Sequence, residues 1–142
     1  MKSASLLCAL LLIVSASGLG AQPPVPLGKL PFSPARKAGN TLFVSGQIAR
    51  TQDGADVKDS VEAETRQVME NLSRILKENG YTTDDVVNVT VYLADIADYP
   101  IMNKVYASYF KNGFPARACV GGVELVFGFK VEMSCIAYKE EK

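Results

Sequence analysis

Histidine and tryptophan are absent from the 142 residues of this chain. Without histidine, an imidazole base, a Ser-His triad and a histidine-ligated metal centre are all excluded. Of the three cysteines, Cys8 lies in an N-terminal apolar run, and Cys119 and Cys135 do not make a metal site by themselves. Any catalysis is therefore expected to use arginine, carboxylates, hydroxyls, a thiol or backbone groups, without a metal.

An excess of positive charge is also lacking, since 15 lysines and arginines balance 15 aspartates and glutamates. The charges are mixed along the chain and form no basic cluster. Nucleic-acid binding usually requires a positive face that displaces counterions from phosphates. We therefore expect no nucleic acid among the partners.

An apolar run long enough to span a membrane is missing from the N-terminus. Residues 1–21 have a positive start at Lys2, an apolar run over residues 6–14 and a small-residue end, which is the order of a secretory signal peptide. Because the run is too short for a comfortable span, we expect cleavage and no stable membrane anchor. The prediction is a soluble protein that is exported, periplasmic or secreted. An uncleaved anchor or a buried first helix is the alternative.

The rest of the chain divides by composition. Residues 22–31 are rich in proline and are typical of an extended linker. Residues 32–139 form the one domain that this length allows, and residues 140–142 are a charged tail.

Local patterns predict a hairpin, a helix and a strand in the first two thirds of this domain. Gly39-Asn40 between two extended runs is the signal of a two-residue hairpin turn. Asp59 is the expected cap of a helix whose apolar residues recur every three or four positions up to Gly80, with Glu64 on the solvated side. Residues 86–93 alternate between apolar and polar, as in a strand with one face on a helical layer.

A second helix and two strands complete the domain. The helix begins after Asp98 and stops at Gly113, and residues 117–125 and 130–138 form a terminal hairpin. Two helices with a sheet of four to six strands predict an α+β fold, a two-layer sandwich with a mixed sheet and both helices on one face. Because nothing in the chain covers the other face, we expect a closed oligomeric ring.

Arg117 and Glu132 are the leading pair for chemistry. Arg117 opens a strand after Phe114-Pro115-Ala116, and its permanently charged fork suits a carboxylate. It therefore needs either a structural acid partner or a ligand anion. A terminal hairpin leaves Glu132 offset from Arg117, so a direct ion pair is allowed but not required.

Three further side chains are candidates with structural alternatives. Cys119 shares a sheet face with Arg117 and is either a small buried residue or one half of a disulfide with Cys135. Asn103, mid-helix, is a poor helix former unless its amide is used. Ser45 can present a hydroxyl, although serine in a strand is usually structural.

Several blocks together resemble the RidA family of reactive-intermediate deaminases, also labelled endoribonuclease L-PSP. The resemblance covers residues 30–137, and the Ser-Gly-Gln and Phe-Pro-Ala-Arg elements are specific in combination. The blocks are residues 30–35, Phe43-Val44-Ser45-Gly46-Gln47, residues 65–72, 85–93 and 103–110, and Phe114-Pro115-Ala116-Arg117.

The resemblance implies a chorismate-mutase-like fold, assembled as a homotrimer with sites between subunits. It implies hydrolysis of 2-iminobutanoate- and 2-iminopropanoate-like enamine/imine intermediates to 2-keto acids and ammonia, with no cofactor. By the same resemblance Arg117 holds the substrate carboxylate, and Glu132, with backbone near Cys119, positions the attacking water. Ser45, Asn103 and the residue at position 32 line the cleft.

Two residues depart from the family pattern. Phe32 stands where the family usually has a tyrosine, and Phe127 replaces a lysine at the cleft rim or subunit edge. The loss of the hydroxyl at Phe32 favours an alternative function, a non-catalytic carboxylate-binding or chaperone-like trimer. A ribonuclease, suggested by one family label, ranks last because the chain has neutral charge and no histidine.

Overall fold

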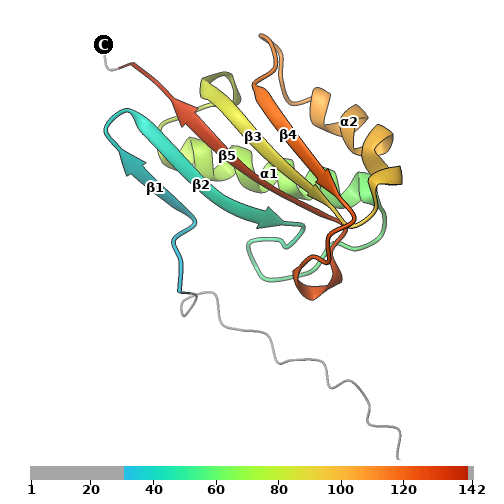
Figure 1. Cartoon of the computed structure of the whole chain (residues 1–142). Coiled ribbons are helices and arrows are strands. Elements are labelled where there is room, and N and C mark those ends of the chain that lie inside the picture. Colours follow the sequence, from blue (N-terminus) through green and yellow to red (C-terminus); the bar gives the residue numbers. More distant parts are fainter. Residues whose placement is uncertain (1–30, 141–142) are drawn as a thin grey trace, which may run out of the picture. The chain divides into compact units, whose positions relative to one another are not determined.

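The structure is a computed structural model that describes residues 31–140. A five-stranded mixed sheet carries two helices on one face (Figure 1), which confirms the predicted α+β fold. The strands are β1 (Ala35–Ala38), β2 (Thr41–Ile48), β3 (Val86–Leu93), β4 (Ala116–Gly121) and β5 (Val131–Tyr138). The helices are α1 (Val61–Glu78) and α2 (Tyr99–Ala107), and short 3-10 turns cover Thr83–Asp85, Ile96–Asp98 and Val126–Gly128.

The strand order β1-β2-β5-β3-β4 corrects the predicted terminal hairpin. β4 lies parallel to β3 at the edge of the sheet, whereas β5 lies antiparallel between β2 and β3. Parallel neighbours require a crossover, and α2 provides it between β3 and β4. The chain after β4 therefore crosses β3 before β5 begins, and the last two strands are not paired with each other.

The predicted hairpin at Gly39-Asn40 is confirmed, because β1 and β2 pair antiparallel from Ala38 and Thr41 outward. Gly39 has a φ of 55°, the left-handed backbone that such a turn needs. β2 runs through Gly46 to Ile48, and its register against β5 shifts between Val44 and Gln47.

The predicted first helix is confirmed, with a different cap. Ser60 caps α1, not Asp59: its side-chain oxygen accepts a hydrogen bond from the backbone N–H of Ala63 at 3.1 Å. The helix ends before Gly80, which has a φ of 84°. Glu64 was expected on the solvated side and is instead fully buried, with its Oε2 accepting from the backbone N–H of Lys130 at 2.6 Å.

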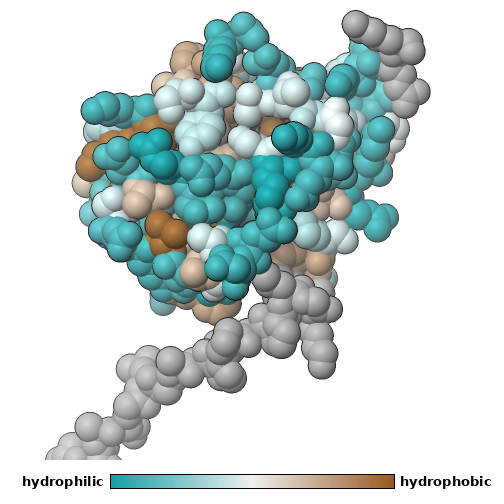
Figure 2. Space-filling model, turned by 180° about the vertical axis from the view of Figure 1, so that it is seen from behind, coloured by the Kyte–Doolittle hydropathy of each residue, from teal (hydrophilic) through white to brown (hydrophobic). Residues whose placement is uncertain are grey.

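The two faces of the sheet differ in their cover. Along β3, residues such as Val89 and Val91 are buried beneath the helices, whereas Thr90 and Tyr92 point to the open face. The side of the molecule opposite to the view of Figure 1 is mostly hydrophilic (Figure 2). The open face, by contrast, exposes Phe43 at 47% and Val120 at 43%.

Candidate active site around Arg117

The guanidinium of Arg117 lies between β4 and α2. In register with Val89, Arg117 points to the helix-covered side of the sheet. Its Nη2 donates to the hydroxyl of Tyr99 at 3.1 Å, and its Cζ lies 4.6 Å from the ring centroid of Tyr106. Two tyrosines of one helix therefore hold the cation by hydrogen bonding and cation–π attraction.

Arg117 has no acid partner among residues 31–140. Ion pairs within this part of the chain use Arg50, Lys58, Arg66 and Arg74, and none includes Arg117. A partly buried guanidinium without a carboxylate retains the fork that binds a planar anion. Of the two alternatives that the sequence left open, this geometry favours a ligand anion.

Tyr99 is the site residue that sequence reasoning missed. The side chain of Asn103, one turn later, and the positive charge of Arg117 lower the pKa of the Tyr99 phenol. Tyr99 and Asn103 stand at positions i and i+4 of α2, a spacing that puts both side chains on one face of the helix. That spacing was the available signal, because Asn103 was already a candidate.

Cys119 lies two residues after Arg117 on the same side of β4 and is partly buried. Burial raises the pKa of its thiol, while the charge of Arg117 acts in the opposite direction. Cys119 pairs with Val91 of β3, and Cys135 pairs with Val89 from the other side of that strand. Since β3 separates the two cysteines by about two strand spacings, roughly 9.6 Å, a disulfide is out of reach and both thiols are free.

Glu132 points to the opposite face of the sheet from Arg117. Its neighbours Val131 and Met133 are fully buried against the helices, so the alternation of β5 puts Glu132 on the open face, beside Ile48 and Tyr92. Burial raises the pKa of its carboxyl. Within one chain, Arg117 and Glu132 therefore do not meet, and the direct ion pair that the sequence allowed is not formed between these residues.

Gly46 leaves the space in which the Glu132 carboxylate lies. A methyl group built on Gly46 would overlap Oε1 of Glu132, so only glycine allows this side-chain position. The neighbouring Ser45 donates its hydroxyl to the carbonyl of Pro34 at 3.0 Å and accepts from Nε2 of Gln47 at 3.2 Å. Gly46 therefore determines where the carboxylate of Glu132 lies.

The residues expected in the site thus form two groups within one chain. Arg117, Cys119 and Asn103 belong to β4 and α2, on the helix-covered side. Glu132 and Ser45 belong to β5 and β2, with Phe32 exposed in the segment that leads into β1.

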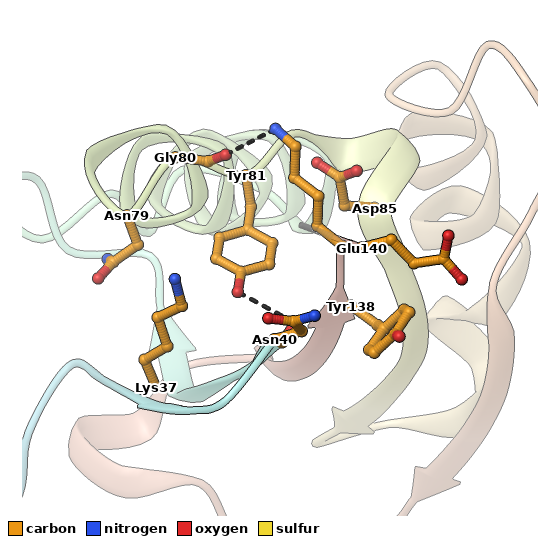
Figure 3. A pocket seen from close by; sticks show the side chains of 9 residues that line it. Lys37, Asn40, Asn79, Gly80, Tyr81, Asp85, Tyr138 and Glu140 are labelled. Carbon is orange, nitrogen blue, oxygen red and sulfur yellow. Dashed lines mark hydrogen bonds between the residues drawn. The ribbon is translucent and has the colours of Figure 1, made fainter. Parts of the chain in front are cut away.

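A pocket at another end of the sheet contains none of these residues (Figure 3). The hydroxyl of Tyr81 donates to the carbonyl of Asn40 at 3.1 Å, and Nζ of Lys139 donates to the carbonyl of Gly80 at 3.0 Å. The first hydrogen bond connects the segment after α1 to the β1–β2 turn, and the second connects the same segment to the residue after β5. The lining residues are Lys37, Asn40, Asn79, Gly80, Tyr81, Asp85, Tyr138, Lys139 and Glu140.

Residues 31–140 contain no cluster of three or more cysteine, aspartate or glutamate side chains placed to hold a metal ion. In the same part of the chain, neither helix has the length and apolar character needed to cross a bilayer.

Comparison with known sequences matches residues 24–139 to the endoribonuclease L-PSP family. A RutC family protein of Pyrococcus horikoshii is 47% identical over 118 residues, which are 82% of this chain and 92% of that protein. Reactive Intermediate Deaminase A, chloroplastic, of Arabidopsis thaliana is 41% identical over 80% of this chain and 60% of that protein. The mitochondrial protein MMF1 of Saccharomyces cerevisiae is 39% identical over 77% of this chain and 75% of that protein.

Solved structures match the same region. RidA from an Antarctic Psychrobacter superposes with a TM-score of 0.74 at 33% identity, covering 82% of this chain and 93% of that one. E. coli TdcF with bound serine has a TM-score of 0.74 at 27% identity, covering 78% of this chain and 89% of that one. These likenesses support the chorismate-mutase-like fold.

The relatives correct the prediction of a signal peptide and a secreted protein. The two relatives above whose names give a compartment are mitochondrial and chloroplastic, and neither is named as secreted. Residues 1–21, on which that prediction rested, lie outside the described residues.

Proposed function

Because the chain belongs to the RidA (endoribonuclease L-PSP) family, we propose that it is a hydrolytic deaminase of 2-imino acids. The products are 2-keto acids and ammonia. One observation carries the proposal: the guanidinium of Arg117 lies between two tyrosines with no acid partner among the described residues. The serine bound in the TdcF structure is a small carboxylate, which agrees with this substrate class.

In the proposed reaction, Arg117 binds the substrate carboxylate through two parallel hydrogen bonds. Glu132 takes a proton from water as the water oxygen bonds to the imine carbon. The same carboxyl then returns the proton to nitrogen, which gives a carbinolamine with one hydroxyl and one amino group on the same carbon. When the hydroxyl proton passes through this carboxyl to the amino group, the C=O bond of the 2-keto acid forms, the C–N bond breaks and ammonia leaves. Burial raises the pKa of Glu132 toward the working pH, which suits a group that must accept and donate one proton.

The opposite orientations of Arg117 and Glu132 favour a site to which a second copy of the chain contributes. We propose a homotrimer in which Arg117 of one subunit and Glu132 of the next share one cleft. The exposed Phe43 and Val120 on the open sheet face support an interface between copies there. Ser45 and Phe32 would line the cleft from the subunit that supplies Glu132, and Asn103 and Cys119 from the subunit that supplies Arg117.

The test is ammonia release from 2-iminopropanoate, generated in situ by an amino-acid oxidase. We expect Arg117→Ala and Glu132→Gln each to lower kcat/KM by at least about 100-fold. Arg74→Ala is the matched control, because Arg74 pairs with Glu78 on the surface of α1. Wild-type activity no higher than that of Arg117→Ala would overturn the deaminase proposal.

Phe32 favours a second candidate, a carboxylate-binding or chaperone-like trimer without turnover. A phenyl ring at this exposed position supplies no hydroxyl for the chemistry. In that case small 2-keto acids should raise the Tm of the wild type but not of Arg117→Ala, and no ammonia should be released.

A further inference from the structure

The hydroxyl of Tyr99 donates no hydrogen bond to any of the described residues. Its oxygen accepts from Nη2 of Arg117 at 3.1 Å, and the hydrogen bond with the side chain of Asn103 lowers the pKa of the phenol, as a bond donated to that oxygen does. The O–H hydrogen therefore points elsewhere. Among the hydrogen bonds within residues 31–140, none is donated by this hydroxyl, and Tyr99 is 38% exposed. A neutral donor therefore lies beside the cation at the position where a ligand anion would bind.

We propose that Tyr99 is a substrate-positioning residue, whose hydroxyl donates a hydrogen bond to the carboxylate that Arg117 holds. This inference rests on the proposed function, because it assigns a second contact to the same anion. Arg117 supplies charge and a planar fork, and Tyr99 adds a donor from α2 whose direction is fixed by its bond to Arg117. The arrangement selects a carboxylate, with two acceptor oxygens, over an amide or ester.

A purely supporting role for Tyr99 predicts a different pH dependence. The groups that face its hydroxyl are Arg117 and Cys119 from β4, and Asn103 from its own helix. Asn103 and Arg117 lower the pKa of Tyr99, so the phenol loses its proton earlier than an ordinary tyrosine on going to alkaline pH. The phenolate then has no hydrogen to donate and repels the carboxylate. If Tyr99 only holds Arg117 in place, removing its hydroxyl leaves the alkaline behaviour of binding unchanged.

The experiment measures pyruvate binding to the full chain by calorimetry between pH 7 and pH 10.5. We expect Tyr99→Phe to weaken binding about tenfold at pH 7, the loss expected for a hydrogen bond to a charged group. Wild-type affinity should fall further as pH rises, and the affinity of Tyr99→Phe should stay nearly level. Tyr109→Phe is the matched control and should bind as the wild type does, because its hydroxyl faces the carbonyl of Arg66 instead.

Two outcomes overturn the inference: Tyr99→Phe binds pyruvate as tightly as the wild type at pH 7, or it keeps the full alkaline loss. The second would assign that loss to Cys119, because burial raises the pKa of Tyr106, the remaining ionisable side chain beside Arg117, to about 12. Arg117→Ala separates the two proposals. If this variant loses binding while Tyr99→Phe does not, only the role of Tyr99 fails; if it binds normally, the proposed carboxylate site fails as well.

Discussion

At the scale of single residues, the partial burial of the Glu132 carboxylate lowers the stability of the folded chain. Burial raises the pKa of its carboxyl, so the folded chain holds this proton more tightly than the unfolded chain does. Above the folded-state pKa the carboxylate is charged and destabilises the fold, and below the ordinary glutamate pKa of about 4.3 both states are protonated. A residue of this kind is expected where chemistry requires it.

Glu132→Gln should therefore be more stable than the wild type at pH 7 while losing activity. Its Tm should be higher at neutral pH, and the difference should close below about pH 4. Thermal melts across this pH range provide the measurement. Glu70→Gln is the control, because Glu70 lies on the exposed side of α1. An unchanged or lower Tm for Glu132→Gln at pH 7 would show that its carboxylate has stabilising partners.

Gly46→Ala should lower activity with little loss of stability. The added methyl group overlaps Oε1 at the end of a flexible side chain, so Glu132 can swing away while the backbone stays in place. We expect kcat to fall at least about tenfold and the free energy of unfolding to change by less than about 1 kcal/mol. The control is Gly46→Ala introduced into the Glu132→Gln variant, where it should cause no further fall in kcat. Additive losses would show that Gly46 acts independently of Glu132.

At the scale of elements, a buried carboxylate joins α1 to the start of β5. Oε2 of Glu64 accepts from the backbone N–H groups of Lys130 at 2.6 Å and Val131 at 3.3 Å, while Oε1 is buried without a partner among the described residues. These backbone groups immediately precede Glu132 in the chain. Glu64 thus fixes the point at which the strand that carries Glu132 begins.

Glu64→Ala should lower the free energy of unfolding by about 3 kcal/mol, because it leaves two buried N–H groups and a cavity. Glu64→Gln should lower the free energy of unfolding by less than about 1 kcal/mol, because an amide oxygen can accept the same hydrogen bonds. Chemical denaturation gives both values. Glu62→Ala, on the exposed side of α1, is the control and should stay within about 0.5 kcal/mol of the wild type. Equal losses for Glu64→Ala and Glu62→Ala would contradict the proposed link between α1 and the start of β5.

At the scale of the whole molecule, the two groups of site residues predict that inactive subunits can complement each other. Arg117→Ala subunits keep Glu132, and Glu132→Gln subunits keep Arg117. When the two variants are unfolded together at equal amounts and reassembled, random mixing gives a complete site at about a quarter of the interfaces.

We therefore expect the mixture to recover up to about a quarter of wild-type activity, measured as ammonia release from 2-iminopropanoate. Each variant treated alone should remain inactive, as should the two assembled variants mixed without unfolding. No recovery in a reassembled mixed trimer would contradict a site shared between subunits.

The sequence alone determined the features that depend on near neighbours in the chain. Gly39-Asn40 gave the hairpin, the spacing of apolar residues gave α1, and alternation gave β3. The matched blocks indicated the family, and the absence of histidine removed whole classes of chemistry. Each of these signals is local because backbone propensity and side-chain periodicity act over only a few residues.

Tertiary structure decided which strands are neighbours and therefore where the side chains of the site point. Sequence adjacency suggested a terminal hairpin, but α2 makes β4 parallel to β3, and β5 enters on the other side. Strand pairing depends on contacts distant in sequence, which local patterns do not specify. The same long-range packing buried Glu64, brought Tyr99 to Arg117, and turned Arg117 and Glu132 to opposite faces of one sheet.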